Sequence, residues 1–457
     1  MESILNTTVG SSKRALIFIS LIVVISIVDS QFINTFYATN LGSPGNYHLV
    51  LFISLVIIVS IINTILLRFT KRNDVHGKAS RPLLFRVAYI GTSAVQYAII
   101  AILAITILEA FVFHGYNKIL SLLVVYLSHF WSAIMLGAIC FIFVHWFRII
   151  RSFSILTYAA VFGVSIFLIL ITLPLLTEHF KPQPELIFPR DYTSLITAII
   201  VSSREIGFIY GLGNYVLPVM LISTWVLTVS LLGPYIQRVG KKKFWLIATL
   251  PLLYQLLTYM IRNANIVTDP AFVQIIYSQQ VQFIFGISYQ VSGIFFAIAF
   301  LAIARKMRRR VMKNYLIISS LGIISLFCSV QPGMPYYAAY PPFGLATLLF
   351  LGLSSYMLLV GMIGIGANVS RDTELRREIY RDLEAHSDIF ENFGMAEVQR
   401  EMERKVIPLT NKFNVADDMR DHIDPTEEDV KIMISEVLNE IESKGSHIKP
   451  NEKNAES

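Results

Sequence analysis

The sequence predicts an all-α, polytopic membrane fold, and its composition, its apolar runs and the placing of its basic residues support this. Of the 457 residues, 54% are hydrophobic and only 15% are charged, and the mean hydropathy is +0.60. A soluble domain is about a quarter charged. Apolar runs of roughly 20 residues, the length that crosses a bilayer as a helix, recur along the chain. The composition therefore places the chain among multi-pass helical membrane proteins.

Ten apolar runs are candidates for membrane-spanning helices. The first covers 15–28, and the others cover approximately 49–68, 84–112, 119–148, 153–176, 210–233, 244–262, 281–305, 314–330 and 343–366. No internal repeat is found among them. The predicted architecture is a transmembrane domain over 1–369 with about ten spans, followed by a small acidic helical cytoplasmic tail.

The first run has two interpretations, and the sequence leaves both open. Its 14 residues would make about 21 Å of helix, which is short for a hydrocarbon core of ~30 Å. Val28 and Ser30 fit the small-residue pattern before a signal-peptide cleavage at Gln31, so residues 1–30 could be removed and nine spans would be left. The alternative is a true first span that extends through Ile33, with Asp29 at the outer interface.

Basic residues alternate between the two sets of connections. The predicted inner connections hold 20 Lys and Arg, whereas the predicted outer ones hold five. Cytoplasmic loops of membrane proteins carry an excess of Lys and Arg, so this positive-inside pattern predicts a cell-membrane protein with both termini in the cytoplasm. The membrane part has a net charge of +16, which indicates orientation signals rather than nucleic-acid binding.

Three predicted outer connections are longer than a tight turn needs: 31–48, 178–210 and 262–280. In the second, Asp191 is a candidate N-cap for an amphipathic helix on the outer interface, which is the favoured interpretation. The alternative is a re-entrant or broken helix that lines a cavity, with Gly207, Gly211 and Gly213 allowing a bend before the span that starts near Tyr210.

The C-terminal tail differs sharply in charge from the rest of the chain. From Arg371 onward it holds 13 basic and 22 acidic residues, a net charge of −9. We predict a cytoplasmic helical module over 370–445 and a disordered end over 446–457. Its clearest helix starts at Asp424, and its apolar stripe consists of Val430, Met433, Ile434, Val437, Leu438 and Ile441.

The boundary between these two parts, 340–383, is the stretch around which the chain is organised. It carries YPPFGLATLLFLGLSSYMLLVG over 340–361, followed by Arg371-Asp372 and Leu375-Arg376. With Gly394-Met395-Ala396-Glu397 and Glu428-Asp429, these motifs resemble a group of multi-spanning membrane proteins of ammonia-oxidising archaea. The resemblance reaches back to about Gly211 and so covers the C-terminal half. It implies an archaeal cell membrane. That group has no assigned activity, so the resemblance supplies no functional residues.

Ionisable side chains at membrane depth are costly and often functional, which makes them the candidate ligand-binding residues. By the predicted topology they all lie in the outer half: Asp29, Glu109, His129, Arg204, Glu205 and Arg262. They could form an outward-facing polar pocket. The favoured alternative is that they are interfacial groups reaching water, or ion pairs between neighbouring helices.

Several neutral residues are expected to hold the helices together. Asn63, Gln96, Gln255 and Gln290 lie inside apolar runs, and interhelical hydrogen bonding is their expected role. Gly91-Thr92-Ser93 has no nearby histidine and is interpreted as a helix-packing site. The two cysteines, Cys140 and Cys328, fall near opposite faces and are expected to be buried free thiols.

No catalytic, metal or nucleotide motif is found, and no cofactor is expected. Three functional classes therefore stay open. The first is a membrane scaffold or sensor-like protein whose tail docks a cytoplasmic partner or folds back onto the inner basic loops. The second is a transporter or channel with the outer pocket, and the third and weakest is a membrane-embedded transferase. Besides the bilayer, the expected partner is a protein and not a nucleic acid.

Overall fold

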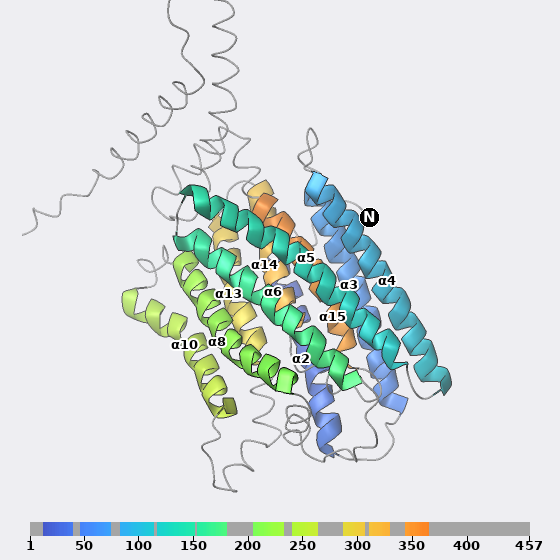
Figure 1. The fold of residues 1–457 in the computed structure, drawn as a ribbon. Coiled ribbons are helices and arrows are strands. Elements are labelled where there is room, and N and C mark those ends of the chain that lie inside the picture. The colour runs from blue at the N-terminus through green and yellow to red at the C-terminus, as the bar shows by residue number, and fades with distance from the viewer. Residues whose placement is uncertain are drawn as a thin grey trace, which may run out of the picture.

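The computed structural model is a bundle of α-helices (Figure 1). It describes residues 12–39, 46–74, 83–113, 117–150, 153–180, 204–232, 240–263, 287–306, 310–329 and 343–364. Within these ranges there is no strand. The tail after 364, with the predicted module 370–445 and the end 446–457, lies outside the described residues, as do most of the long predicted outer connections.

Ten α-helices follow one another, one for each of the ten apolar runs. They are α2 (Ser12–Thr39), α3 (Asn46–Asp74), α4 (Leu83–Phe113), α5 (Lys118–Ile150), α6 (Phe153–Phe180), α8 (Arg204–Leu232), α10 (Lys241–Asn263), α13 (Ser288–Lys306), α14 (Arg310–Ser329) and α15 (Leu345–Leu358). Six are long and apolar enough to cross a membrane, and shorter apolar stretches lie in α2, α8 and α13. The all-helical class is confirmed for the described residues, and the six long apolar helices fit a multi-pass membrane protein. The number of spans stays a prediction.

Two helices are longer than the sequence suggested. Helix α2 has 28 residues, roughly 42 Å at 1.5 Å per residue, so it is not too short to span a bilayer. Helix α8 begins at Arg204 rather than near Tyr210 and continues to Leu232 through Gly207, Gly211 and Gly213. The less favoured alternative, a break at these glycines, is not seen within 204–232, where the helix is continuous, because a glycine only permits a bend. The favoured interfacial helix after Asp191 lies outside the described residues.

The centre of the bundle is α15, the last described helix. Every residue of its apolar span is buried, whereas only 28% of the corresponding span of α4 is. Helix α15 packs against α14, α5, α3, α4 and α2. Figure 1 shows it enclosed by helices from the whole length of the chain. The described part of the boundary stretch, residues 343–364, thus forms the interior of the fold.

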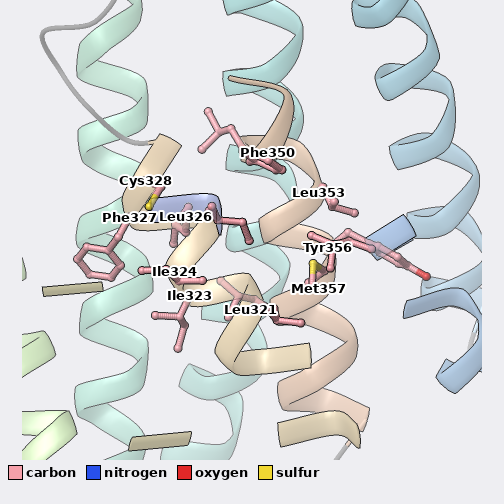
Figure 2. Close-up of a cluster of buried hydrophobic side chains, with 14 of the residues drawn as sticks. Leu321, Ile323, Ile324, Leu326, Phe327, Cys328, Phe350, Leu353, Tyr356 and Met357 are labelled. Atoms are coloured by element: carbon pink, nitrogen blue, oxygen red, sulfur yellow. The ribbon is translucent and has the colours of Figure 1, made fainter. Parts of the chain in front are cut away.

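The two most buried helices, α14 and α15, meet along a dense apolar seam (Figure 2). In this cluster the side chain of Leu321 on α14 extends toward Met357 on α15. Gly322 allows the close approach, because a Cβ there would touch both the side chain and the backbone of Leu358. Small residues serve this purpose between membrane helices, where tight van der Waals packing drives association.

Irregular backbone marks both ends of α15. Before it, Gly344 has a φ of 89°, a left-handed conformation that glycine adopts without steric cost. After it, the chain forms a π-helical turn at η4 (Leu359–Ile363). Such turns are rare and are often found at functional sites. Both features fall on the one helix that is buried throughout.

The helices alternate in direction, so their basic termini collect at one end of the bundle. The ends of α3, α5 and α13 and the starts of α4, α10 and α14 lie toward the upper side of Figure 1. We call this the basic end, and its described basic residues are Arg68, Lys71, Arg72, Arg86, Arg148, Lys241, Lys242, Lys243, Arg305, Arg310 and Lys313. The expected inner residues therefore share one end of the fold.

The two cysteines are free thiols, as expected. Cys328 is buried in α14, between Phe327 and Ser329. Cys140 is only half-buried, so the prediction that both are buried is right for Cys328 alone. The Cys140 thiol donates to the carbonyl oxygen of Ala159 at 3.4 Å and thereby contributes to the contact between α5 and α6.

Candidate functional site

The start of α15 is capped by a carboxylate from the other end of the sequence. Asp29 of α2 is fully buried. Its Oδ1 accepts a hydrogen bond from the backbone N–H of Gly344 at 2.8 Å, and its Oδ2 accepts one from the backbone N–H of Thr347 at 3.2 Å. The first N–H groups of a helix have no partner within the helix and attract negative charge. Asp29 satisfies two of these donors at a fully buried position.

Neighbouring polar groups extend this contact to α13 and α14. Ser26, one turn before Asp29, donates to the carbonyl oxygen of Cys328 at 3.0 Å and accepts from Nε2 of Gln290 at 3.1 Å. The hydroxyl of Ser329 lies 2.6 Å from the carbonyl oxygen of Ser325 in its own helix and 3.1 Å from that of Thr347 on α15, so its one hydrogen is shared between them. The expected interhelical role of Gln290 is thus confirmed, since it joins α13 to α2.

One turn further along α15, two amides meet the helix backbone. Asn63 of α3 donates through Nδ2 to Oε1 of Gln96 on α4. Gln96 in turn donates through Nε2 to the carbonyl oxygen of Leu349 at 2.9 Å. The expected roles of Asn63 and Gln96 are therefore confirmed, and the pair ties three helices together. The side chain of Gln255 lies outside the described part.

The Gly91-Thr92-Ser93 segment of α4 is a packing site, as the sequence indicated. The ring of Trp131 on α5 lies so close to Gly91 that a Cβ there would overlap it. The indole Nε1 of Trp131 donates to the hydroxyl of Thr92 at 3.0 Å. Beside it, the hydroxyls of Ser132 and Ser355 share a hydrogen bond, which joins α5 to α15.

These contacts form one set that runs along α15. Asp29, Ser329, Gln96 and Ser132 hydrogen-bond to it from α2, α14, α4 and α5, and we call these four residues the α15 ladder. Each interhelical hydrogen bond within a membrane protein contributes roughly 0.6 to 2 kcal/mol. Their donors and acceptors are specific in position, so the ladder fixes the axial position of α15 relative to its neighbours.

The basic end has a further polar junction, between α3 and α14. Nδ2 of Asn314 donates to Oδ1 of Asn73 at 2.7 Å, and the hydroxyl of Tyr315 donates to the carbonyl oxygen of Asn73 at 3.2 Å. The ring of Tyr315 lies against Gly364, where a Cβ would overlap it. The last described residues after η4 are thus packed against the α3–α14 junction.

The predicted ligand residues are placed as follows. Glu109 accepts a hydrogen bond from the backbone N–H of Asn117 at 2.9 Å and so closes the exposed turn between α4 and α5. His129 is buried in α5, where its Nδ1 lies 2.8 Å from the carbonyl oxygen of Val125 and 3.2 Å from the hydroxyl of Ser128. Asp29, Glu109 and His129 therefore bond to different partners.

The other three predicted ligand residues are placed by their backbones only. Arg204 and Glu205 open α8, and Arg262 lies near the end of α10, while their side chains lie outside the described part. In Figure 1 the start of α8 and the ends of α10, α2 and α4 lie toward the lower side, opposite the basic end. The placement at one end agrees with the sequence. A shared pocket for the six residues stays a prediction.

Sequence reasoning missed the serines that hydrogen-bond along α15 and the asparagines that join α3 to α14. Ser132, Ser329 and Ser355 occur among many serines in apolar runs, and Asn73 and Asn314 lie beside charged loops. Nothing local distinguishes them, because their role depends on the helix that each one faces. Asp29 was singled out as a ligand candidate, but its partners are more than 300 positions away.

The polar contacts around α15 hold this helix against its neighbours. Across the described residues, no group of three or more His, Cys, Asp or Glu side chains could hold a metal ion. Comparison of the chain with protein-family models, with curated proteins and with solved structures finds no match. A functional proposal must therefore come from the arrangement around α15.

Proposed function

We propose that the chain is a scaffold or sensor-like protein of an archaeal cell membrane, in which α15 links the predicted outer end to a partner-docking cytoplasmic tail. Both termini face the cytoplasm in this proposal. The observation that supports it best is the α15 ladder, because four helices hold one fully buried helix whose C-terminal end leads toward the tail at 370.

A helix held in this way transmits displacement. Packed interiors change between discrete arrangements rather than deform gradually. A shift at Gly344, where Asp29 holds the start of α15, would move the whole helix and so reach Gly364 beside Tyr315. The π-helical turn lies between these ends and is the least regular part of the path. The outer cap and the origin of the tail would then respond together.

The tail is proposed to fold back onto the basic end. Its net charge of −9 complements the basic residues at 241–243 and 305–313. An exposed ion pair contributes only a few tenths to about 1 kcal/mol, but tethering raises the effective concentration to about the millimolar range. A cytoplasmic partner with its own basic surface could therefore compete for the tail. The apolar stripe from Val430 to Ile441 is expected to pack within the tail.

Crosslinking of the full-length protein in proteoliposomes tests the docking. We expect crosslinks between the tail and 305–313 at low salt and their loss at about 1 M salt, where screening shortens the electrostatic range to a few ångströms. Crosslinks that persist unchanged at high salt would show that charge does not hold the tail.

A matched pair of serine variants tests the link through α15. Ser355→Ala removes a ladder contact, and we expect it to change the rate of tryptic cleavage within 370–457. Ser54→Ala removes a hydroxyl that donates to the carbonyl oxygen of Val50 in its own exposed turn, and we expect no change. Equal cleavage rates in both variants and the wild type would count against a helix that transmits motion to the tail.

A transporter or channel is the second candidate, favoured by the fully buried carboxylate of Asp29. Intramembrane carboxylates mark ion and proton pathways in many transporters. Solute or proton flux into proteoliposomes, lost in Asp29→Asn, would establish it. The membrane-embedded transferase gains no support of its own, because both oxygens of Asp29 are engaged by the backbone of α15.

A further inference from the structure

Cationic side chains of α3 lie beside one tyrosine of α4 at the basic end. The ammonium of Lys71 on α3 lies 4.3 Å from the centroid of the Tyr89 ring on α4. Arg68, one turn earlier on α3, also acts electrostatically on the Tyr89 hydroxyl. Arg86 lies three residues before Tyr89 and so on the same side of α4. Arg68, Lys71 and Arg86 are all exposed, and we call them with Tyr89 the α3–α4 cluster.

The charge of this region is unbalanced. Between Arg68 and Arg86 the sequence holds six basic residues and one acid, Asp74, whose side chain lies outside the described part. Like charges on one helix face repel each other, and a bound anion offsets that repulsion. Arg68 and Lys71 lie on the same face of α3, so one anion can contact both. The cluster therefore favours an anionic ligand with several acceptor oxygens.

The surface below the cluster is apolar and faces outward. Val87 and Ile90 on α4 are 53% and 56% exposed, and Ile61 on α3 is 54% exposed. Ile61 lies two turns before Arg68 on the same face of α3, and Ile90 lies one turn after Arg86 on the same face of α4. A ligand that suits both surfaces has an anionic group at one end and a hydrocarbon chain at the other. A free phosphate or an acidic peptide would use only the cluster.

The cluster also connects to the centre of the fold. The ring of Tyr89 lies 6.3 Å from that of Tyr356, centroid to centroid, at an interplanar angle of 53°. Tyr356 is fully buried on α15, directly after Ser355 of the ladder contact. Figure 2 shows Tyr356 pointing away from α14 toward the neighbouring helices. The ring of Tyr89 thus lies between the exposed Lys71 and the Tyr356 ring of α15.

From this geometry we propose that the α3–α4 cluster binds the phosphate of an anionic lipid of the inner leaflet, whose hydrocarbon chain lies along Ile90 and Ile61. The Tyr89–Tyr356 pair then connects lipid occupancy to the position of α15. Basic sites between membrane helices on the cytoplasmic side bind anionic headgroups in this way. The proposal requires the basic end to face the cytoplasm, but it does not require the tail to dock.

Titration of the full-length protein with phosphatidylglycerol in neutral detergent, followed by native mass spectrometry, measures lipid binding at the α3–α4 cluster. Lys71→Gln and Arg68→Gln should each weaken binding about fivefold, the effect of one Lys or Arg near an anionic surface. Arg148→Gln is the matched control, because it removes one exposed charge from the same end of the bundle and should change binding by less than about twofold. Equal losses in all three variants would overturn the site, since only general surface charge would then act.

Two further variants preserve every charge and so distinguish the site from a folding defect. Tyr89→Phe keeps a ring for Lys71 and should bind phosphatidylglycerol as the wild type does. Tyr89→Leu removes the ring and should weaken binding. If both bind equally, Tyr89 does not organise the cluster, and that part of the proposal is wrong.

Other possible ligands of the α3–α4 cluster predict different binding results. Phosphatidylcholine should bind equally to the wild type and to Lys71→Gln. Millimolar inorganic phosphate should not displace phosphatidylglycerol, because it gains nothing from the apolar surface. If inorganic phosphate displaces the lipid fully, or if only the chain that ends at 369 binds it, the cluster holds a free anion or the tail, and the lipid site is refuted.

Discussion

The Oδ1 atom of Asp29 accepts a hydrogen bond of 2.8 Å from the backbone N–H of Gly344, 315 positions later in the chain. This contact joins the first described helix to the last one at the buried start of α15. It also ends a left-handed glycine turn, which aims the N–H groups of α15 at the carboxylate. Several expectations follow from this junction and from the packing beside it.

Replacement of Asp29 should destabilise the protein. Asp29→Ala leaves the N–H groups of Gly344 and Thr347 buried without acceptors, and we expect a loss of about 1 to 3 kcal/mol in the free energy of unfolding. Asp29→Asn keeps one carbonyl oxygen and should lose less. Chemical unfolding in detergent, followed by tryptophan fluorescence, measures both losses.

Glu109→Ala provides the control for that measurement. Glu109 also accepts a backbone N–H, that of Asn117, but this contact is exposed, so water can replace it. We expect a loss below about 1 kcal/mol. If Asp29→Ala is as mild as Glu109→Ala, the buried cap contributes nothing beyond an ordinary surface cap.

Helix α2 should be retained in the mature protein. Its buried residues include Ile22, Ser26 and Asp29, and cleavage before Gln31 would remove all of them together with the cap of α15. Peptide mapping of the protein purified from membranes should therefore recover peptides from 15–30. An N-terminus at position 31 would show that the first run is a signal peptide and that α15 begins without its cap.

Gly91 should not tolerate a larger residue. Gly91→Ala places a methyl group into the rigid ring of Trp131, and overpacking of this kind costs roughly 1 to 3 kcal/mol. Gly137→Ala on α5 is the matched variant, because a Cβ there meets nothing within 4 Å. Helix propensity alone should make it neutral or more stable by up to about 1 kcal/mol. The same unfolding assay compares the two, and equal stabilities would contradict the Trp131 contact.

The orientation can be tested by cysteine labelling. A cysteine at position 336 should react with a membrane-impermeant maleimide from outside intact cells, and one at position 310 should react only after permeabilisation. Arg310 opens α14 at the basic end, so it should face the cytoplasm if Lys and Arg set the topology. The reverse pattern would invert the fold in the membrane and remove the basis for an inner-leaflet lipid site.

Several local expectations are confirmed because their causes are local. Asn63, Gln96 and Gln290 lie where polar groups must find a partner on another helix, so an interhelical role follows from position alone. Gly91 follows from the absence of a side chain in an otherwise bulky run. The alternative of a break at Gly207, Gly211 and Gly213 is not seen within 204–232, because glycine lowers the cost of a bend without imposing one.

The sequence by itself determined the helical, multi-pass class and the ends of the bundle at which its charges lie. Both depend on composition and spacing, because a bilayer demands long apolar helices and penalises buried charge. Only the tertiary structure decided that the last apolar run is the central helix, that Asp29 caps it, and that Tyr89 joins Lys71 to Tyr356. These relations depend on which helix faces meet, and residues far apart in the chain carry no local signal of their partners.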